Sequence, residues 1–378
     1  MKIVCDNKIP FLKGVLEPYA EVVYLPGAKT TPEDVRDADA IITRTRTACK
    51  EPLLAGSKVK VIATATIGFD HIDTAWCEAN GILWQNCPGC NSWSVKQYMA
   101  SVLVTVARNR GLDLGSMTLG VVGVGNVGSK VAEVAALLGM KVLLNDPPRA
   151  RREGPEKFVS LDEIIAQSDI ITVHVPLIRE GGDATLHLFD DARIRSMRPT
   201  QMLMNSSRGP VVDNKALKAA LADHAIAGAV LDVWEGEPDL DPELVNMLDL
   251  STPHIAGYSA DGKANGTWMS VQTVAKVLDL PLKDWKVKEI PAPEQPLEFT
   301  LDATGKTMQE VLTEAVLHTY EVTEDSDRLR ANLGSFEALR GDYQIRREFT
   351  AFTVRLVGGT EEQCERLGKI GFNVIKGS

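Results

Sequence analysis

Three short polar segments in the second half of the chain each place an ionisable side chain next to glycine or proline. In chain order they carry Arg208, Glu237 and His254. An arginine guanidinium can hold a carboxylate through two parallel hydrogen bonds. A histidine whose ring is oriented by a carboxylate can accept the proton of a hydroxyl group. We therefore expect these three residues to form a catalytic group that binds a carboxylate and moves a proton.

A glycine-rich segment earlier in the chain has the spacing of a dinucleotide-binding loop. Gly123, Gly125 and Gly128 follow an apolar run and precede a helical pattern. The first glycine permits a tight turn, the second lets a pyrophosphate approach the backbone, and the third allows close helix packing. The helix N-terminus would offer free amides and the positive end of its dipole to the phosphates.

An acidic residue after the next apolar run indicates which dinucleotide is bound. Asp146 can accept hydrogen bonds from the adenosine ribose hydroxyls, and its charge would repel a 2′-phosphate. The basic run 149–152 could hold such a phosphate, but after two prolines we interpret it as a solvated, exposed loop. The expected cofactor is therefore NAD rather than NADP.

Other candidate ligands have simpler interpretations. His174 ends a strand beside the glycine loop, so we expect it, with Val175, to line the cofactor site rather than to act as the base. His71 lies between two aspartates, a pattern that a capped helix N-terminus explains better than a metal site. Cys87 and Cys90 form a lone Cys-Pro-Gly-Cys segment, which indicates a turn ahead of a helix. We expect no bound metal.

The overall composition restricts the partners. Among 378 residues, 51 acidic and 41 basic side chains give a formal net charge of -10. Nucleic-acid binding requires a basic surface, so we expect no nucleic-acid partner. We also expect no membrane partner and a cytoplasmic location, because no apolar run has the length of a membrane span or a signal core. The six scattered cysteines argue against a disulfide scaffold.

Alternating strand and helix patterns predict an α/β fold with two doubly wound, Rossmann-like domains. Capping patterns at Thr31–Asp34 and Ser160–Glu163 mark helix starts. The proline-rich segment 289–296 precedes a small α+β part with a strand at 349–357. The expected domains are residues 1–93 completed by 259–283, residues 94–258, and residues 284–378.

Taken together, these segments resemble the D-isomer-specific 2-hydroxyacid dehydrogenases over about residues 40–280. The resemblance implies a cleft between a substrate-binding lid (the first domain) and an NAD-binding domain (the second). It implies that Arg208 binds the substrate carboxylate, Glu237 orients His254, and His254 is the acid/base. The motifs that carry the resemblance are Gly68–Asp73, Asn86–Val95, the glycine loop, Ser206–Gly209, Asp232–Pro238 and Pro253–Gly257.

The same resemblance implies cofactor contacts. Asp232 matches the position that contacts the nicotinamide carboxamide. Asn126 and Val127 would lie over the pyrophosphate, and the remaining cofactor-lining positions are Ser206, Ser207, Arg208 and Gly257.

Within the family, the chain is most similar to members that oxidise a four-carbon 2-hydroxy acid phosphorylated at its far end. That likeness implies substrate contacts by Thr45, Thr66 and Tyr258. It also implies that the C-terminal part is a dimerisation domain, so we expect a homodimer. The Thr45-Arg46 pair departs from the pattern of these members, which leaves the role of Arg46 open.

A phosphorylated substrate carries a second anion that needs its own cation. The available cations in the first domain are Arg44, Arg46 and Lys8, and Arg346 and Arg347 could reach across a dimer.

Two alternatives stay open. A dehydrogenase of 3-phosphoglycerate would need the same catalytic residues, although the C-terminal part lacks a clear βαββαβ regulatory pattern. A non-catalytic, NAD-sensing corepressor would need an exposed peptide-binding surface, for which the sequence gives no signal.

Overall fold

The computed structural model describes residues 1–377 and divides into two compact units. The first comprises Met1–Asn91 and Ser259–Pro291, and the second comprises Ser92–Tyr258 and Ala292–Ser378. None of the helices within residues 1–377 is both long and apolar enough to cross a membrane.

The first unit is built on a five-stranded parallel sheet in the order β2-β1-β3-β4-β5. Its central strands β3 and β4 are buried along their whole length, which explains why they read as unbroken apolar runs. The long helix α11 packs against both of them. The strands are β1 (Lys2–Asp6), β2 (Glu21–Leu25), β3 (Ala40–Thr43), β4 (Val61–Thr64) and β5 (Leu83–Gln85). The helices are α1 (Pro32–Val35), α2 (Glu51–Leu54), α3 (Thr74–Ala79) and α11 (Ala260–Val277).

The second unit contains a six-stranded parallel sheet in the order β11-β10-β9-β8-β6-β7. The chain leaves β6 toward β7 on one side and then crosses to β8 on the other, which creates a topological switch point at β6 and β8. The strands are β6 (Thr118–Val122), β7 (Lys141–Asn145), β8 (Ile170–Val173), β9 (Met202–Asn205), β10 (Gly228–Leu231) and β11 (Leu250–Ser251). The helices are α4 (Ser92–Arg110), α5 (Asn126–Leu137), α6 (Pro147–Glu153), α7 (Leu161–Gln167), α8 (Asp191–Ser196), α9 (Asn214–Ala222) and α10 (Pro242–Met247).

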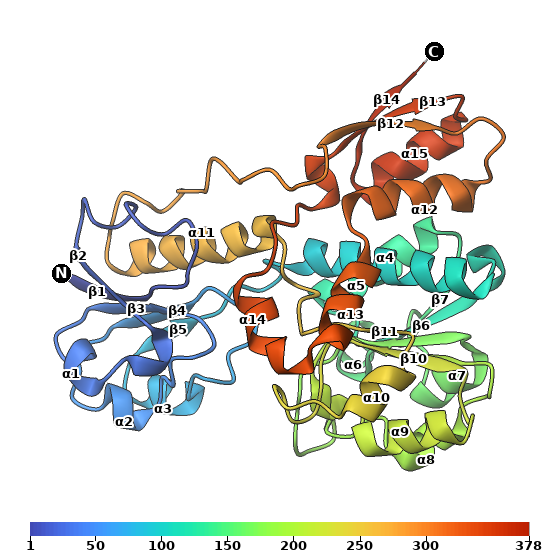
Figure 1. Cartoon of the computed structure of the whole chain (residues 1–378). Helices are drawn as coiled ribbons and strands as arrows, with labels where there is room; N and C mark the ends of the chain where they lie inside the picture. The colour runs from blue at the N-terminus through green and yellow to red at the C-terminus, as the bar shows by residue number, and fades with distance from the viewer. Residues whose placement is uncertain (378) are drawn as a thin grey trace. The chain divides into compact units, whose positions relative to one another are not determined.

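The C-terminal part of the second unit adds a three-stranded parallel sheet in the order β12-β13-β14. Its helices α12 and α13 pack against α4, and α15 packs against α5 (Figure 1). The strands are β12 (Glu298–Asp302), β13 (Thr353–Val357) and β14 (Asn373–Lys376). The helices are α12 (Met308–Thr319), α13 (Val322–Ala331), α14 (Phe336–Gly341) and α15 (Glu361–Ile370). The expected α/β fold with a small C-terminal α+β part is confirmed.

The structure confirms two helix starts predicted from the sequence and corrects one predicted strand. The helix start expected after Thr31 is present, with Pro32 as the first helical residue, and the capping box expected at Ser160 is present. The strand expected over 349–357 was wrong in its first half, because residues 349–351 form a 3-10 turn and β13 begins at Thr353. Phe349 and Phe352 are both fully buried. In a 3-10 turn, residues three positions apart lie on the same side, so the turn directs both rings into the core.

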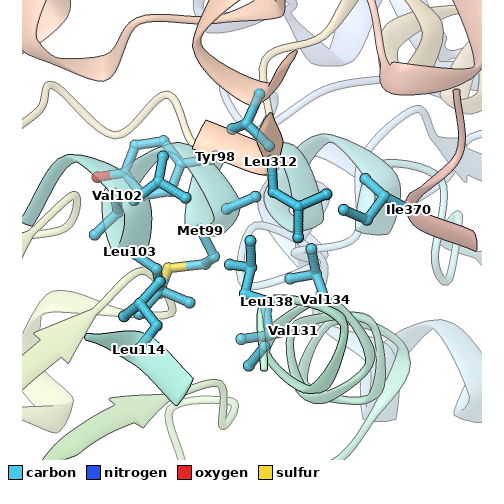
Figure 2. Packing of buried hydrophobic residues seen from close by; sticks show 14 of the residues in the cluster. Tyr98, Met99, Val102, Leu103, Leu114, Val131, Val134, Leu138, Leu312 and Ile370 are labelled. Atoms are coloured by element: carbon cyan, nitrogen blue, oxygen red, sulfur yellow. The ribbon is translucent and has the colours of Figure 1, made fainter. Parts of the chain in front are cut away.

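One continuous apolar core joins the C-terminal part to the large sheet. Helix α4 is buried along most of its length within this core. Figure 2 shows Leu312 of α12 and Ile370 of α15 beside Val134 of α5 and Leu138, the residue that follows α5, all of them nearly or fully buried. The C-terminal part is therefore packed into the second unit rather than tethered beside it.

Replacing Leu312 with Ala should lower the free energy of unfolding by about 2–5 kcal/mol, because the removed atoms leave a cavity between α12 and α4. Urea unfolding followed by circular dichroism measures the change. Met247→Ala is the matched control, since that side chain is 41% exposed, and it should change the value by less than about 0.5 kcal/mol. Equal effects of both substitutions would contradict the packing described here.

Candidate active site

The three residues expected to do chemistry follow three neighbouring strands. Arg208, Glu237 and His254 come after the carboxyl ends of β9, β10 and β11, which are adjacent in the sheet. Parallel strands end at the same edge, and ligands bind at that edge in open α/β sheets. The topology thus brings residues separated by 46 positions of sequence to one edge of one sheet.

His254 and Glu237 are in direct hydrogen-bond contact. The Nδ1 atom of His254 lies 2.9 Å from Oε2 of Glu237, and both side chains are largely shielded from solvent. The other carboxylate oxygen accepts a hydrogen bond from the Trp234 amide at 2.9 Å. Because Glu237 occupies Nδ1, the ring nitrogen left for a substrate is Nε2.

The electrostatic surroundings keep the Glu237 carboxylate charged. Burial raises its pKa, but the hydrogen bond and charge of His254, the Trp234 amide and the charge of Arg340 together bring the pKa below its ordinary value of 4.5. A charged Glu237 can stabilise a protonated His254 during proton transfer.

The loop that carries His254 is held by Asp232, a fully buried carboxylate at the end of β10. Asp232 accepts hydrogen bonds from the Thr252 hydroxyl and from the amides of Ile255 and Ala256. His254 itself has a φ of 57°, the left-handed region that costs a non-glycine residue energy. The flanking bonds to Asp232 oppose relaxation of this strained turn.

Arg346 holds the other side of the same loop. Its guanidinium donates to the carbonyls of Ile255 and Ala256 and to the Ser94 hydroxyl, and the side chain is only 2% exposed. The expectation that Arg346 could reach a phosphate across a dimer was therefore wrong, because its donors are directed at the protein interior. For Arg347 the structure shows a main-chain contact, in which its carbonyl accepts from the Gln97 side chain.

Arg208 lies on a turn that its neighbours organise. The Asn205 side chain donates to the carbonyl of Arg208 and accepts from the amide and hydroxyl of Ser207. A Cβ atom on Gly209 would lie 2.0 Å from the Trp234 carbonyl, so only glycine fits after Arg208. One guanidinium nitrogen donates to the Ser207 carbonyl.

The glycine loop has the geometry that a pyrophosphate requires. Gly123 has a φ of 86°, and a Cβ atom there would lie 2.6 Å from the His174 carbonyl. A Cβ on Gly128 would lie 1.9 Å from the Gly123 carbonyl, so helix α5 packs against the loop only with glycine. A Cβ on Gly125 meets nothing within 4 Å, and α5 begins there without a side-chain cap. The open space and free amides fit a dinucleotide phosphate group.

Asp146 caps the next helix rather than pointing freely into solvent. Its carboxylate accepts from the Arg149 amide at 3.0 Å and from the Val124 amide at 2.8 Å. The expectation that the basic run 149–152 is a loop was wrong, since these residues lie in α6. The helix forms there because Asp146 caps it and two prolines occupy its first positions. Arg149 is paired with Glu153 within this helix.

The two other histidines considered as candidates, His174 and His71, both have lowered pKa values. His174 lies directly at the glycine loop, where desolvation lowers its pKa to about 3, and Val175 packs beside Gly123. Burial lowers the pKa of His71 to about 4, and Asp73 caps α3 by accepting from the Trp76 amide. Within residues 1–377 no group of three His, Cys, Asp or Glu side chains is arranged to hold a metal ion.

The cysteines of the Cys-Pro-Gly-Cys turn are free thiols. Burial raises the pKa of Cys87 to about 11, and its sulfur donates to the carbonyls of Thr64 and Gly266. A protonated, buried thiol of this kind is a packing residue.

The expected substrate residues of the first unit follow the carboxyl ends of β3 and β4. Thr45 and Arg46 are exposed after β3, whereas Arg44 donates to the Lys8 carbonyl at 3.3 Å. The Thr66 hydroxyl, after β4, donates to the Gly68 carbonyl at 2.9 Å.

Tyr258 lies in the second unit, where its hydroxyl accepts a hydrogen bond from Arg340 at 3.1 Å. Arg340 was not among the residues expected from the sequence, because α14 is distant in sequence from every motif of the site.

The fold and site define an NAD-dependent dehydrogenase of the 2-hydroxyacid type. The family model for the D-isomer specific 2-hydroxyacid dehydrogenase, NAD binding domain, matches residues 92–256, and a domain of unknown function, DUF3410, matches residues 293–371. A solved structure of D-lactate dehydrogenase from Aquifex aeolicus, complexed with NAD and lactic acid, is similar with a TM-score of 0.63 and 28% identity. The similarity covers 74% of this chain and 96% of that structure.

Curated relatives make the assignment more specific. Erythronate-4-phosphate dehydrogenase of Bacteroides fragilis (strain NCTC 9343) is 51% identical over 355 residues, which is 94% of this chain and 99% of the relative. The enzyme of the same name from Shigella flexneri is 40% identical over 378 residues and covers 99% of both chains. The chain belongs to the erythronate-4-phosphate dehydrogenase family within the D-isomer-specific 2-hydroxyacid dehydrogenases.

Replacing Gly125 with Ala should weaken NAD binding by at least about tenfold while leaving the fold intact. The added methyl group has room in the protein but would enter the space expected for the pyrophosphate. Fluorescence titration with NADH measures the affinity. Gly368→Ala is the control, because its Cβ also meets nothing within 4 Å but lies on α15. Unchanged affinity in both variants would contradict the role of the loop.

Replacing Glu237 with Gln should make the free energy of unfolding less dependent on pH in the acid range. A carboxyl group whose folded pKa is depressed stabilises the fold above its ordinary pKa of 4.5 and loses this effect as pH falls through the folded value. The free energy of unfolding of the wild type should therefore fall more steeply below about pH 4.5 than that of the variant. Urea titrations at a series of pH values test this expectation, and parallel curves would refute it.

Proposed function

We propose that this protein oxidises the 2-hydroxyl of 4-phospho-D-erythronate with NAD, giving 2-oxo-3-hydroxy-4-phosphobutanoate in the synthesis of pyridoxal phosphate. The observation that carries the proposal is the 2.9 Å hydrogen bond between His254 and Glu237, on the same sheet edge as Arg208. The names of the curated relatives support this choice of substrate.

The proposed reaction divides its tasks among the three residues. Arg208 binds the C1 carboxylate and fixes the orientation of C2. Nε2 of His254 accepts the proton of the 2-hydroxyl, and Glu237 stabilises the resulting imidazolium. Bound NAD would supply the acceptor for the hydride, which leaves C2 with its electron pair. The carbon is oxidised to a carbonyl, and the proton on His254 is returned in the reverse reaction.

The proposed cofactor contacts follow from the same sheet edge. The pyrophosphate would lie against the amides of Asn126 and Val127, and the ribose hydroxyls against Asp146. Asp232 would accept from the nicotinamide carboxamide while it holds the loop of His254. The remaining contacts would come from Val175, Ser206, Ser207 and Gly257.

The domain roles are also part of the proposal. Residues 1–93 with 259–283 would form the substrate-binding lid, with Arg44, Thr45, Arg46 and Thr66 contacting the substrate. Residues 94–258 would bind NAD, and Tyr258 would contact the substrate from this side.

Residues 284–378 would form the interface of a homodimer. Two observations support such an interface: β12 and β14 are the edge strands of their sheet, and Ile375 on β14 is 39% exposed. A cytoplasmic protein without a nucleic-acid partner is consistent with the net charge of -10.

A single-turnover assay tests the proposed reaction. Protein loaded with NAD is mixed with 4-phospho-D-erythronate or with 3-phospho-D-glycerate, and NADH absorbance is followed. Turnover is expected with the four-carbon substrate, and His254→Ala should reduce the rate by about 10²- to 10⁴-fold because the acid/base is lost.

The controls separate the alternatives. His224→Ala is a matched control on an exposed turn and should leave the rate unchanged. Turnover with phosphoglycerate alone would make the substrate assignment wrong while leaving the mechanism intact. Silence with both substrates would favour a non-catalytic NAD sensor.

A further inference from the structure

Helix α14 places an arginine beside the site. The Nη2 atom of Arg340 donates to the Tyr258 hydroxyl at 3.1 Å, and its side chain is 18% exposed. The guanidinium carbon also lies 5.8 Å from the centre of the Tyr258 ring and 5.5 Å from that of Phe336. Two aromatic rings thus shield the cation from water while leaving part of it accessible.

The hydrogen-bonding capacity of Arg340 is only partly used. Its Nη1 atom lies 3.3 Å from the carboxylate of Glu337, a side chain that is 48% exposed. The Nε atom is buried and has no hydrogen-bond partner within residues 1–377. A guanidinium has five N–H donors, and a buried donor without an acceptor costs free energy. The buried Nε atom is out of reach of a ligand, but Nη1 and Nη2 carry four N–H groups and use one each on Glu337 and Tyr258, so the partly exposed end of Arg340 has donors for an incoming anion.

The position of Arg340 has a consequence for the catalytic pair. Its charge lies close enough to lower the pKa of the Glu237 carboxyl group, although the contributions of His254 and the Trp234 amide are larger. Arg340 is therefore near the catalytic pair as well as near Tyr258.

These observations point to a role in specificity. We propose that Arg340 is a specificity-determining residue that binds the phosphate of the substrate, with the Tyr258 hydroxyl beside it. The inference rests on the proposed function and extends it, since Arg208 is assigned to the carboxylate and the phosphate needs a separate cation. The planar fork of an arginine can pair with two phosphate oxygens. In this arrangement, the second unit supplies a cation for each end of a doubly anionic substrate.

Comparing substrates with and without the phosphate tests the assignment. Steady-state rates are measured for 4-phospho-D-erythronate and D-erythronate with wild type, Arg340→Gln, Arg340→Lys and Arg195→Gln. Arg195, on α8, is the control because it is a half-exposed arginine paired with Asp191 and Asp223. Inhibition constants for inorganic phosphate and D-erythronate are measured as well, so that slow turnover of D-erythronate still leaves a comparison.

Arg340→Gln should lower kcat/KM for the phosphorylated substrate by about 10- to 150-fold, the effect of losing a charged hydrogen-bonding partner. The inhibition constant of inorganic phosphate should rise by a similar factor. The corresponding values for D-erythronate should change by less than about threefold. Arg340→Lys should recover part of the loss because it keeps the charge without the fork, and Arg195→Gln should match the wild type.

Equal losses for both substrates would overturn the assignment and make Arg340 a positioning residue for Glu237 and Tyr258. Unchanged phosphate inhibition in Arg340→Gln would also overturn it. A wild type that does not oxidise 4-phospho-D-erythronate would refute the proposed function instead. In that case binding of inorganic phosphate, measured by isothermal titration calorimetry with wild type and Arg340→Gln, would still show whether Arg340 binds the anion.

Discussion

The loop that carries His254 is fixed between two buried charges, and the geometry of the site depends on this arrangement. Asp232 accepts the amides of Ile255 and Ala256, while Arg346 donates to the carbonyls of the same two residues. Both the amide groups and the carbonyl groups of this short stretch of backbone are therefore bound to side chains that are almost completely inaccessible to solvent. A buried charge without partners would cost several kcal/mol, so each ion and the loop depend on one another.

This arrangement explains how His254 can remain in a left-handed backbone conformation. A strained backbone conformation persists only where the surrounding contacts hold it in place, and the hydrogen bonds on either side of His254 do so. In this conformation the ring lies 2.9 Å from Glu237, which in turn is held by the Trp234 amide. In the proposed role of proton acceptor, a ring held in this way would not need to be ordered when the substrate arrives, which would reduce the entropic part of the barrier.

The sequence was sufficient for the local and periodic features of the molecule. Alternating βα patterns predicted both large sheets, and the glycine spacing predicted the turn from β6 into α5. Arg208, Glu237 and His254 could be placed together because each follows a parallel strand, and such strands end at one edge.

What the sequence did not predict depends on contacts between distant segments. The short edge strand β5 and the strand β12 carry exposed or alternating residues with weak strand signals. Arg340 was not a candidate, and Arg346 was considered only as a phosphate ligand across a dimer. Their contacts with Tyr258 and Ser94 span 82 and 252 positions of sequence, so only the folded chain distinguishes a buried anchor from a solvated charge.

The two arginines also change the interpretation of the C-terminal part. If this part served only to join two subunits, its interior contacts with the large sheet would need only apolar residues, such as Leu312 and Ile370. Instead, residues 340–346 direct one arginine to the backbone beside His254 and another to Tyr258. Burying a charge is costly, and apolar packing would stabilise the same interface at lower cost. The position of these charges therefore supports the proposed site, in which the C-terminal part would hold the loop of His254 and Tyr258 within its own chain.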